Sequence, residues 1–333
     1  MDNFAQLAET VGAAGIVLTF LLLHLLVGFF LSPGRPFLWG LFYHAGAEIE
    51  RRLNRPGKTP AELYARGAIV LLVMALFGFL IGRAFEKIAF YDYGWLGLIL
   101  LLLISVSALG PLQVLRRLDH DLTKNKTESA ADLIRAVTST DTKKQDGHSL
   151  IRSGVSFSAL SLNSHFIAPI FWYVLGGPVF MMIYIVLSGL RAATETPESS
   201  SAGFFSAPIK LLHKVMDFIP LRLTFLLMVL ASFFVSGANP WRSFKTACAQ
   251  AKNYRPADEG LLVAAMAGGL GVTLGGPVRR KGLTIEHGWV GPKESTAKLS
   301  AADLKRAAVL HFVVFLCGMI LTAAVLLATY KFS

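Results

Sequence analysis

The sequence predicts an all-α integral membrane protein, and three observations lead to this prediction. Hydrophobic residues make up 54% of the 333 residues and charged residues only 16%, which is unusual for a soluble globular protein. Several apolar runs approach the roughly 20 residues that an α-helix needs to cross a bilayer. Lysines and arginines collect in alternate segments between these runs, as they do in multi-pass membrane proteins.

The apolar runs predict about six transmembrane helices in a single membrane domain, residues 1–333. Asp2 and Glu9 precede the first run and no lysine or arginine does, so we interpret this run as a retained span and not as a signal peptide. The predicted spans are, in chain order, residues 11–31, 64–82, 95–112, 167–190, 221–235 and 307–329.

The distribution of basic residues predicts the orientation. Of the 32 lysines and arginines, 25 lie in or directly beside the segments 32–63, 113–166 and 236–306. Because basic loops stay on the cytoplasmic side, we expect these three segments in the cytoplasm and both termini outside it. The expected location is a bacterial-type inner membrane, with the lipid bilayer as the first partner of the chain.

The net charge of +11 indicates that the chain binds an anionic partner. The basic residues flank the spans and form no recognition-helix, RNP or zinc-finger pattern, so we expect no nucleic-acid partner. Anionic lipid headgroups or a phosphorylated substrate fit this charge better. The two cysteines, Cys248 and Cys317, offer no disulfide framework, and the sequence holds no phosphate-loop, HExxH or CxxC motif, so no metal site is predicted.

Two stretches outside the spans carry apolar residues at helical spacing and predict interfacial helices. Such helices place their apolar face in the headgroup region and their charges toward water. The repeated apolar positions are Leu112, Leu115, Leu118 and Leu122 in one stretch, and Phe205, Ile209, Leu212 and Met216 in the other. The segment 260–276 is rich in glycine and alanine, and we interpret it as a re-entrant segment or a tightly packed small-residue helix.

The sequence also allows predictions for three further polar residues. His24 and His311 lie inside predicted spans, where an ionisable residue is a candidate functional group, although a neutral imidazole hydrogen-bonded between helices is the commoner outcome. Ser300 stands three residues before Asp303, which is typical of a helix start.

The tetrapeptide Leu-Gly-Gly-Pro occurs twice, at Leu175–Pro178 and Leu274–Pro277, and each copy closes a hydrophobic stretch. A glycine pair before proline stops a helix and exposes backbone polar groups. In lipid this exposure is costly unless the site is buried in protein or faces water. The two copies are therefore either helix-ending turns or broken helices that mark a site.

The residues around both copies resemble those of a known membrane family. The segment 36–69 contains Ile-Glu-Arg-Arg-Leu-Asn-Arg-Pro at Ile49–Pro56, and Asp141 is followed by Thr142. Ala168–Trp172 precedes the first tetrapeptide, and Ala264–Gly268 precedes the second. In order and spacing these segments resemble the adenosylcobinamide-phosphate synthase family of cobalamin biosynthesis, called CobD or CbiB.

The resemblance implies ATP-dependent amide formation at the membrane, in which a propionate carboxylate of a corrinoid is joined to a phosphorylated amino alcohol. ATP and Mg²⁺ would then be cofactors, and corrinoid and amino alcohol phosphate would be partners. The resemblance and the residue types nominate as ligand-binding candidates Glu50, Arg51, Asp141, Trp172, Gly176, Gly177, Asp258, Gly275 and Gly276. For Glu50 and Arg51, a membrane-flanking charge cluster is an equally good interpretation.

The chain departs from the family pattern mainly where the family has acids and amides. Arg191 stands where the family has an aspartate, and Val263 replaces a glutamate. Leucine and serine cannot supply the negative charge that a cation needs. The other replaced positions are Ser156, Leu160, Ser161, Ser164, Ile185 and Ser188. If the missing acids form the Mg·ATP site, this chain should lack ordinary synthase activity.

Three hypotheses therefore remain. The chain is a divergent working member of cobalamin synthesis, a catalytically degenerate homologue that binds a ligand or partner, or a scaffold subunit for another membrane protein. AmpE, a related membrane protein linked to β-lactamase induction, is an example of an accessory or signalling assignment in the wider group.

Overall fold

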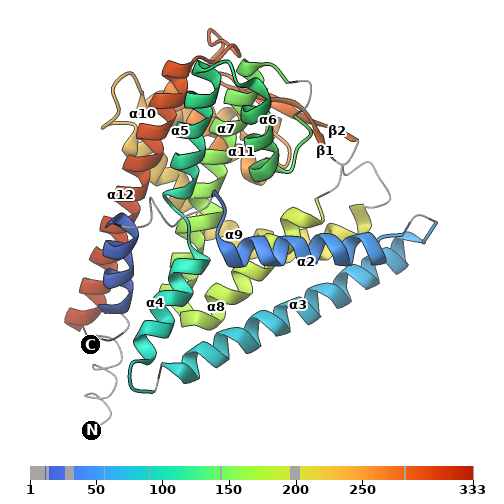
Figure 1. Cartoon of the computed structure of the whole chain (residues 1–333), viewed down its shortest axis with the longest axis vertical. Coiled ribbons are helices and arrows are strands. Elements are labelled where there is room, and N and C mark those ends of the chain that lie inside the picture. The colour runs from blue at the N-terminus through green and yellow to red at the C-terminus, as the bar shows by residue number, and fades with distance from the viewer. Residues whose placement is uncertain are drawn as a thin grey trace.

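The computed structural model describes residues 12, 15–26, 34–55, 57–89, 91–142, 145–195, 203–280 and 283–332. Helices dominate it, as predicted (Figure 1). In chain order they are α2 (Phe37–Leu53), α3 (Pro60–Ile88), α4 (Gly94–Ser105), α5 (Gly110–Thr123), α6 (Thr127–Thr138), α7 (Gly147–Leu162), a π-helical turn (Asn163–Ile167), α8 (Ala168–Ala193), α9 (Gly203–Ala231), α10 (Pro240–Gln250), a 3₁₀ turn (Ala251–Asn253), α11 (Ala257–Leu270) and α12 (Ala301–Phe332).

The structure confirms a mainly α-helical chain and adds one short hairpin that was not predicted. Strands β1 (Leu274–Arg280) and β2 (Leu283–Val290) form an antiparallel hairpin that begins at the second Leu-Gly-Gly-Pro. Gly275 and Gly276 have φ near +95° and +94°, a conformation that ends the helical path and that glycine adopts without strain. A side chain at Gly275 would come within 2.3 Å of the Gly288 carbonyl oxygen, so glycine also permits the close approach of the two strands.

Long apolar helices confirm a multi-pass membrane protein. Within the described residues, four stretches are long and apolar enough to cross a bilayer, and they overlap four of the predicted spans. These stretches are Pro60–Ile88, Gly94–Thr123, Gly147–Ala193 and Ala301–Ala328. The predicted span 11–31 lies partly outside the described residues, and its described part, Gly15–Leu26, is a shorter apolar helix. The predicted span 221–235 falls mostly in the second half of α9, which is not among the four stretches.

Helix α3 shows how such a stretch is built. Thr59 accepts a hydrogen bond from the Glu62 backbone N–H, the Glu62 carboxylate accepts one from the Thr59 backbone N–H, and Pro60 occupies the first turn. Gly78 and Gly82 let α8 approach closely. The opposite face exposes large apolar side chains, as a lipid-facing helix does: Ile69, Leu72, Val73, Leu76 and Leu80.

Neither predicted interfacial helix places its faces as expected. The leucines of α5 pack against α6, α7 and α12, with Leu112, Leu115 and Leu118 buried and Leu122 half-buried. In α9, Phe205 and Ile209 of the predicted apolar face are buried, but so are His213 and Asp217, whereas Leu211 and Val215 are exposed. The buried face of α9 therefore combines apolar and polar side chains, and a second apolar face, which the periodicity did not predict, points outward.

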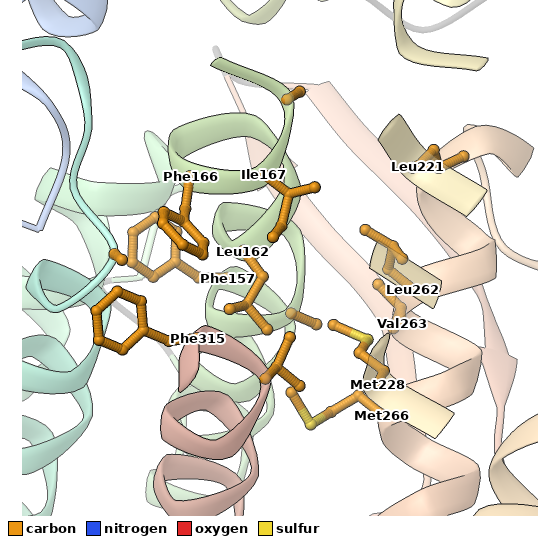
Figure 2. Packing of buried hydrophobic residues seen from close by; sticks show 14 of the residues in the cluster. Phe157, Leu162, Phe166, Ile167, Leu221, Met228, Leu262, Val263, Met266 and Phe315 are labelled. Atoms are coloured by element: carbon orange, nitrogen blue, oxygen red, sulfur yellow. The ribbon is translucent and has the colours of Figure 1, made fainter. Parts of the chain in front are cut away.

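The hydrophobic core lies between α7, α9, α11 and α12 (Figure 2). Phe157 and Leu162 come from α7, Met228 from α9, Met266 from α11 and Phe315 from α12. The six residues 262–267 of α11 have no exposed surface, which is typical of a helix that is enclosed on all sides. The segment 260–276 is thus a tightly packed small-residue helix that ends at residue 270 and leads into β1.

Two histidines satisfy the backbone at the break between α4 and α5. The Ala108 N–H donates to His24 Nε2 at 3.1 Å, and the Ala108 carbonyl accepts from His311 Nε2 at 2.8 Å. His311 Nδ1 lies 2.8 Å from the Ser158 hydroxyl. These partners assign neutral imidazoles that join four segments of the chain, which confirms the hydrogen-bonded interpretation of both histidines. At the start of α12, Asp303 accepts from the Ser300 N–H, which confirms the predicted helix start.

We expect His311→Phe to lower the free energy of unfolding by about 1–3 kcal/mol, because the buried Ala108 carbonyl and Ser158 hydroxyl would lose their partner. Chemical unfolding of the purified protein in detergent measures this change. His120→Phe is the control, since the His120 side chain is 56% exposed. Equal stability of the two variants would contradict the role of His311.

Candidate functional site

A cavity of about 210 Å³ lies where α6, α7, α8, α9, α11 and the hairpin meet the start of α2. Its lining comes from all three segments that the sequence assigned to the cytoplasm, and also from residues 188–195 and 213–221, at both ends of the segment between the predicted spans 167–190 and 221–235. The six-span prediction places that segment on the opposite side of the membrane. Its lining combines hydroxyl groups with charged side chains of both signs, and this composition distinguishes it from the apolar core beside it.

Helix α7 and the π-helical turn supply the hydroxyl side of the cavity. Ser149, Ser153 and Ser156 recur at helical spacing on one face of α7. The π-helical turn adds a residue to the helical path, a feature often found at functional sites. Asn163 from this turn also lines the cavity, where it donates a hydrogen bond to the Asp217 carboxylate at 2.8 Å.

The Asp217 carboxylate is held from two sides. Tyr184 donates its hydroxyl to the same oxygen, Oδ1, at 2.9 Å. Asn163 is in turn oriented by Thr224, whose hydroxyl donates to the Asn163 side-chain oxygen at 3.0 Å. His213, one helical turn earlier on α9, lies beside the Tyr184 ring in a tilted arrangement with 5.7 Å between ring centroids. The carboxylate is therefore fixed in position by neutral donors.

Two ion pairs cross the cavity wall. Arg191 Nη1 lies 2.6 Å from Glu259 Oε1, and Arg280 Nη1 lies 2.5 Å from Glu195 Oε2. Each pair is mostly buried, with side chains between 9% and 20% exposed. Arg280 also donates to the Ala192 carbonyl, so the hairpin is attached to the end of α8. Glu195 is near Arg191 as well, and the four charges alternate in sign.

The surroundings shift the pKa values of the two glutamates in opposite directions. Burial would raise the pKa of Glu195, but the positive charges of Arg280 and Arg191 outweigh it and hold the pKa below its ordinary value. Burial raises the pKa of Glu259 above its ordinary value, and the nearby Glu195 adds to this effect against the attraction of Arg191. Of the two, Glu259 is the one that accepts a proton more readily.

Two further arginines line the cavity without a carboxylate in contact among the described residues. The Arg35 guanidinium lies over the rings of Trp39 and Tyr43, 4.8 Å and 5.1 Å from their centroids. Arg152 lies 5.3 Å from the Trp289 ring and donates to the Ala297 carbonyl at 2.6 Å. The cavity therefore carries more guanidinium than carboxylate groups, namely four against Glu195, Asp217 and Glu259.

Among the predicted ligand-binding residues, Gly275 and Gly276 line the cavity. Asp258 lies at the start of α11 near the cavity and faces Lys214 at 3.7 Å. Asp141 pairs through its backbone with Arg279 of the hairpin, and its N–H donates to the Arg279 carbonyl at 2.7 Å.

The other predicted residues do not line the cavity. Gly176 and Gly177 form a kink inside α8, where Gly177 has φ +63° and faces Glu86 of α3. Trp172 packs against Phe171 and Phe180 near this kink. Glu50 is buried in α2, whereas Arg51 is exposed and pairs with Glu48. The two Leu-Gly-Gly-Pro copies thus serve different purposes: the second shapes the cavity and the first bends a helix.

Sequence reasoning missed most of the charged residues in the cavity. His213 and Asp217 were assigned to a solvated face, although their i, i+4 spacing in an otherwise apolar helix was a usable signal for an inward polar face. Arg35 and Arg280 looked like membrane-flanking charges. By contrast, the positions where the chain departs from the family pattern do mark the cavity, because six of them line it: Ser156, Leu160, Ser161, Ser164, Ser188 and Arg191.

The donor set does not fit a divalent cation held by protein carboxylates. Glu195 and Glu259 are engaged with arginines, and Asp217 already accepts two hydrogen bonds at one oxygen. Within the described part of the chain, no three His, Cys, Asp or Glu side chains converge as metal ligands would. The free guanidinium groups fit phosphate or carboxylate oxygens instead.

Fold and cavity together define a multi-pass helical membrane protein with a polar cavity lined by charged side chains. The family described as CobD/CbiB protein matches residues 17–311. The chain therefore belongs to the CobD/CbiB family, as its motifs indicated.

Individual relatives agree with this assignment. A "Cobalamin biosynthesis protein CobD" from Halalkalibacterium halodurans is 27% identical over 80% of this chain and 85% of the relative. Proteins of the same name from Listeria monocytogenes and Clostridium perfringens are 24% and 30% identical, over 65% and 54% of this chain. The matched regions span 67% and 56% of those two relatives. No solved structure matches the chain.

We expect Arg191→Gln and Glu259→Gln each to lower the free energy of unfolding by about 3–5 kcal/mol, because each leaves a buried charge without its partner. The double variant should lose less than the sum of the two, and a double-mutant cycle on the purified protein measures the difference. The exposed pair Arg135–Asp132 is the matched control, where the coupling should be about 0–1 kcal/mol. Additive losses at Arg191 and Glu259 would contradict a coupled pair.

Proposed function

We propose that this chain has a CobD-like role in cobalamin biosynthesis, in which its cavity binds a phosphorylated amino alcohol for amide formation at the membrane. The family membership and the names of the relatives support the pathway. The observation that carries the proposal is that one cavity holds a fixed carboxylate together with two guanidinium groups, those of Arg35 and Arg152, that contact no carboxylate among the described residues.

Such a substrate carries both charges on one small molecule. Its phosphate oxygens match guanidinium donors, which bind phosphate in a planar two-bond geometry. Its amino group matches the Asp217 carboxylate, which Asn163 and Tyr184 hold in place. The cavity offers donors and an acceptor at different places, because Arg35 interacts electrostatically with Tyr43 and Arg280, while Asp217 is held by Asn163 and Tyr184.

The residues also suit the chemistry of amide formation. The amine must be neutral when its nitrogen forms a bond to an activated carboxyl carbon and the leaving group departs. A positioned carboxylate such as Asp217 can hold the proton that the nitrogen releases. The arginines orient the phosphate end of the same molecule, so the nitrogen is presented from a fixed direction.

The composition of the cavity changes what we infer from the family acids that this chain lacks. Serine and leucine at Ser156 and Leu160 predicted a site without carboxylates. Glu195, Asp217 and Glu259 bring carboxylates to the same cavity from other positions. The presence of carboxylates from other positions supports a divergent working member of the family over a degenerate or purely scaffolding one.

For the topology, we propose a bacterial inner membrane protein with both termini outside the cytoplasm. The six-span prediction places residues 191–220 outside, but Arg191 and Glu195 contact Glu259 and Arg280 of a predicted cytoplasmic segment, so we propose that residues 167–235 enter and leave the membrane from the cytoplasmic side. The apolar helix at Gly15–Leu26 would then cross the bilayer together with α3, α4 and α12, an even number that keeps both termini outside. The second half of α9 and the residues after it expose large apolar side chains, as a lipid-facing segment would: Leu226, Leu230, Phe233 and Phe234.

The proposed function predicts that the chain restores cobalamin-dependent growth to a strain that lacks its own CobD-type synthase. Asp217→Asn should abolish most of this rescue, because the amide cannot hold the proton. Asp132→Asn, at an exposed aspartate of α6, is the control. Membrane insertion is confirmed by immunoblotting of the membrane fraction. Failure of the inserted wild-type chain to rescue growth would contradict the proposal and favour an accessory role.

The proposed topology predicts that a reporter fused after Ser333 is active only outside the cytoplasm. An alkaline phosphatase fusion at this position should be active, and a fluorescent protein that folds only in the cytoplasm should be dark. The same two reporters inserted after Gly57, in a predicted cytoplasmic segment, should give the opposite pattern. A cytoplasmic signal at Ser333 would overturn the proposed topology.

A further inference from the structure

Two buried nitrogen donors of the cavity arginines have no acceptor among the described residues. They are Arg35 Nε and Arg280 Nε. Buried donors are nearly always paired, because a donor removed from water without an acceptor costs about 1–3 kcal/mol, and more when it is charged. Two such donors on neighbouring arginines of one cavity point to a ligand that carries acceptor oxygens.

The other nitrogens of Arg35 are also weakly bonded. Among the described residues, its two terminal nitrogens donate to the Ser139 hydroxyl alone, both at 3.4 Å, which is a long distance for a hydrogen bond. Burial lowers the pKa of Arg35 to about 10; the neighbouring Tyr43 opposes this effect, and the positive charge of Arg280 adds to it. The surroundings of Arg35 therefore disfavour its cationic form.

The carboxylates of the cavity do not provide a compensating negative charge. Glu195 is bound to Arg280, and Glu259 is bound to Arg191. The same pairing leaves a divalent cation without a set of protein ligands, as shown above. The positive charge that Mg²⁺ would bring to a phosphate is thus already present in the side chains of the protein.

We propose that the cavity binds its anionic ligand without a divalent cation, with the guanidinium groups of Arg35 and Arg280 supplying the positive charge. This inference rests on the proposed function for the identity of the site, and it adds how the phosphate is held. Arg35 is then an anion-binding residue. Arg280 has two tasks, since it holds Glu195 with one terminal nitrogen and offers Nε to the ligand.

A purely structural Arg35 and a ligand-binding Arg35 predict opposite effects on the empty protein. Removing a buried cation that lacks a carboxylate partner relieves its desolvation and the repulsion from Arg280. Arg35→Gln should therefore leave the melting temperature of the ligand-free protein unchanged or higher, while it weakens ligand binding. A structural arginine would lower the melting temperature when it is replaced.

The experiment measures binding of phosphoethanolamine, a simple amino alcohol phosphate, to the purified full chain in detergent by isothermal titration calorimetry. Titrations in excess EDTA and in excess Mg²⁺ should give affinities that agree within about threefold. Arg35→Gln should weaken binding by at least about tenfold in both conditions, whereas Arg35→Lys should retain part of the affinity. Arg135→Gln, an exposed arginine of α6, should bind like the wild type.

Each other outcome overturns the inference. Binding that appears only with Mg²⁺ would overturn it and leave the proposed function intact. Wild-type binding by Arg35→Gln, or a lower melting temperature of its ligand-free form, would show that Arg35 is structural. Absence of binding in both conditions would also overturn the inference, and growth rescue by the wild-type chain then decides separately whether the proposed function stands.

Discussion

The structure depends on one constraint: polar groups placed away from water must find partners inside the protein. The break between α4 and α5 shows this constraint most directly. Its backbone groups are taken up by His24 and His311, and the Ser107 N–H donates to the carbonyl of His165. Through these hydrogen bonds, the break between α4 and α5 is attached to α12, α7, the π-helical turn and the helix at Gly15–Leu26.

The same constraint organises the cavity. The charges at the end of α8, on α11 and on the hairpin alternate in sign, so Glu195 and Glu259 each face an arginine. Asp217 is stabilised by neutral donors because no cation contacts it within hydrogen-bonding distance in the described structure. Where the pairing is incomplete, at Arg35 and at one nitrogen of Arg280, the remaining donors indicate what the ligand must bring.

The replacement of family acids is also understandable in these terms. At Arg191 the chain has a charge opposite to the family's aspartate, and the structure compensates with Glu259 on a helix that is far away in sequence. Ser188, at another replaced position, accepts a hydrogen bond from the Trp39 indole at 3.0 Å and so connects α2 to α8. Such exchanges preserve the packing of the cavity while they redistribute its charge.

Local patterns were sufficient for the membrane character, for most of the long apolar helices and for the family, because hydropathy, helix starts and glycine–proline motifs act over a few neighbouring residues. They also found the start of α12 at Ser300 and the packed helix that ends near residue 270. They could not show that Leu274–Pro277 begins a strand, because the partner strand follows later in the chain and the close approach to Gly288 is a tertiary contact.

The sequence by itself therefore determined that this chain is a helical membrane protein of the CobD/CbiB family with an altered set of polar residues. Only the tertiary structure decided which of those residues share a site. The physical reason is that the direction of a helix face depends on its surroundings: α9 turns Asp217 inward because outside it faces an apolar environment and inside it faces Asn163 and Tyr184. Charge pairs such as Arg280–Glu195, 85 positions apart, exist only once the chain has folded.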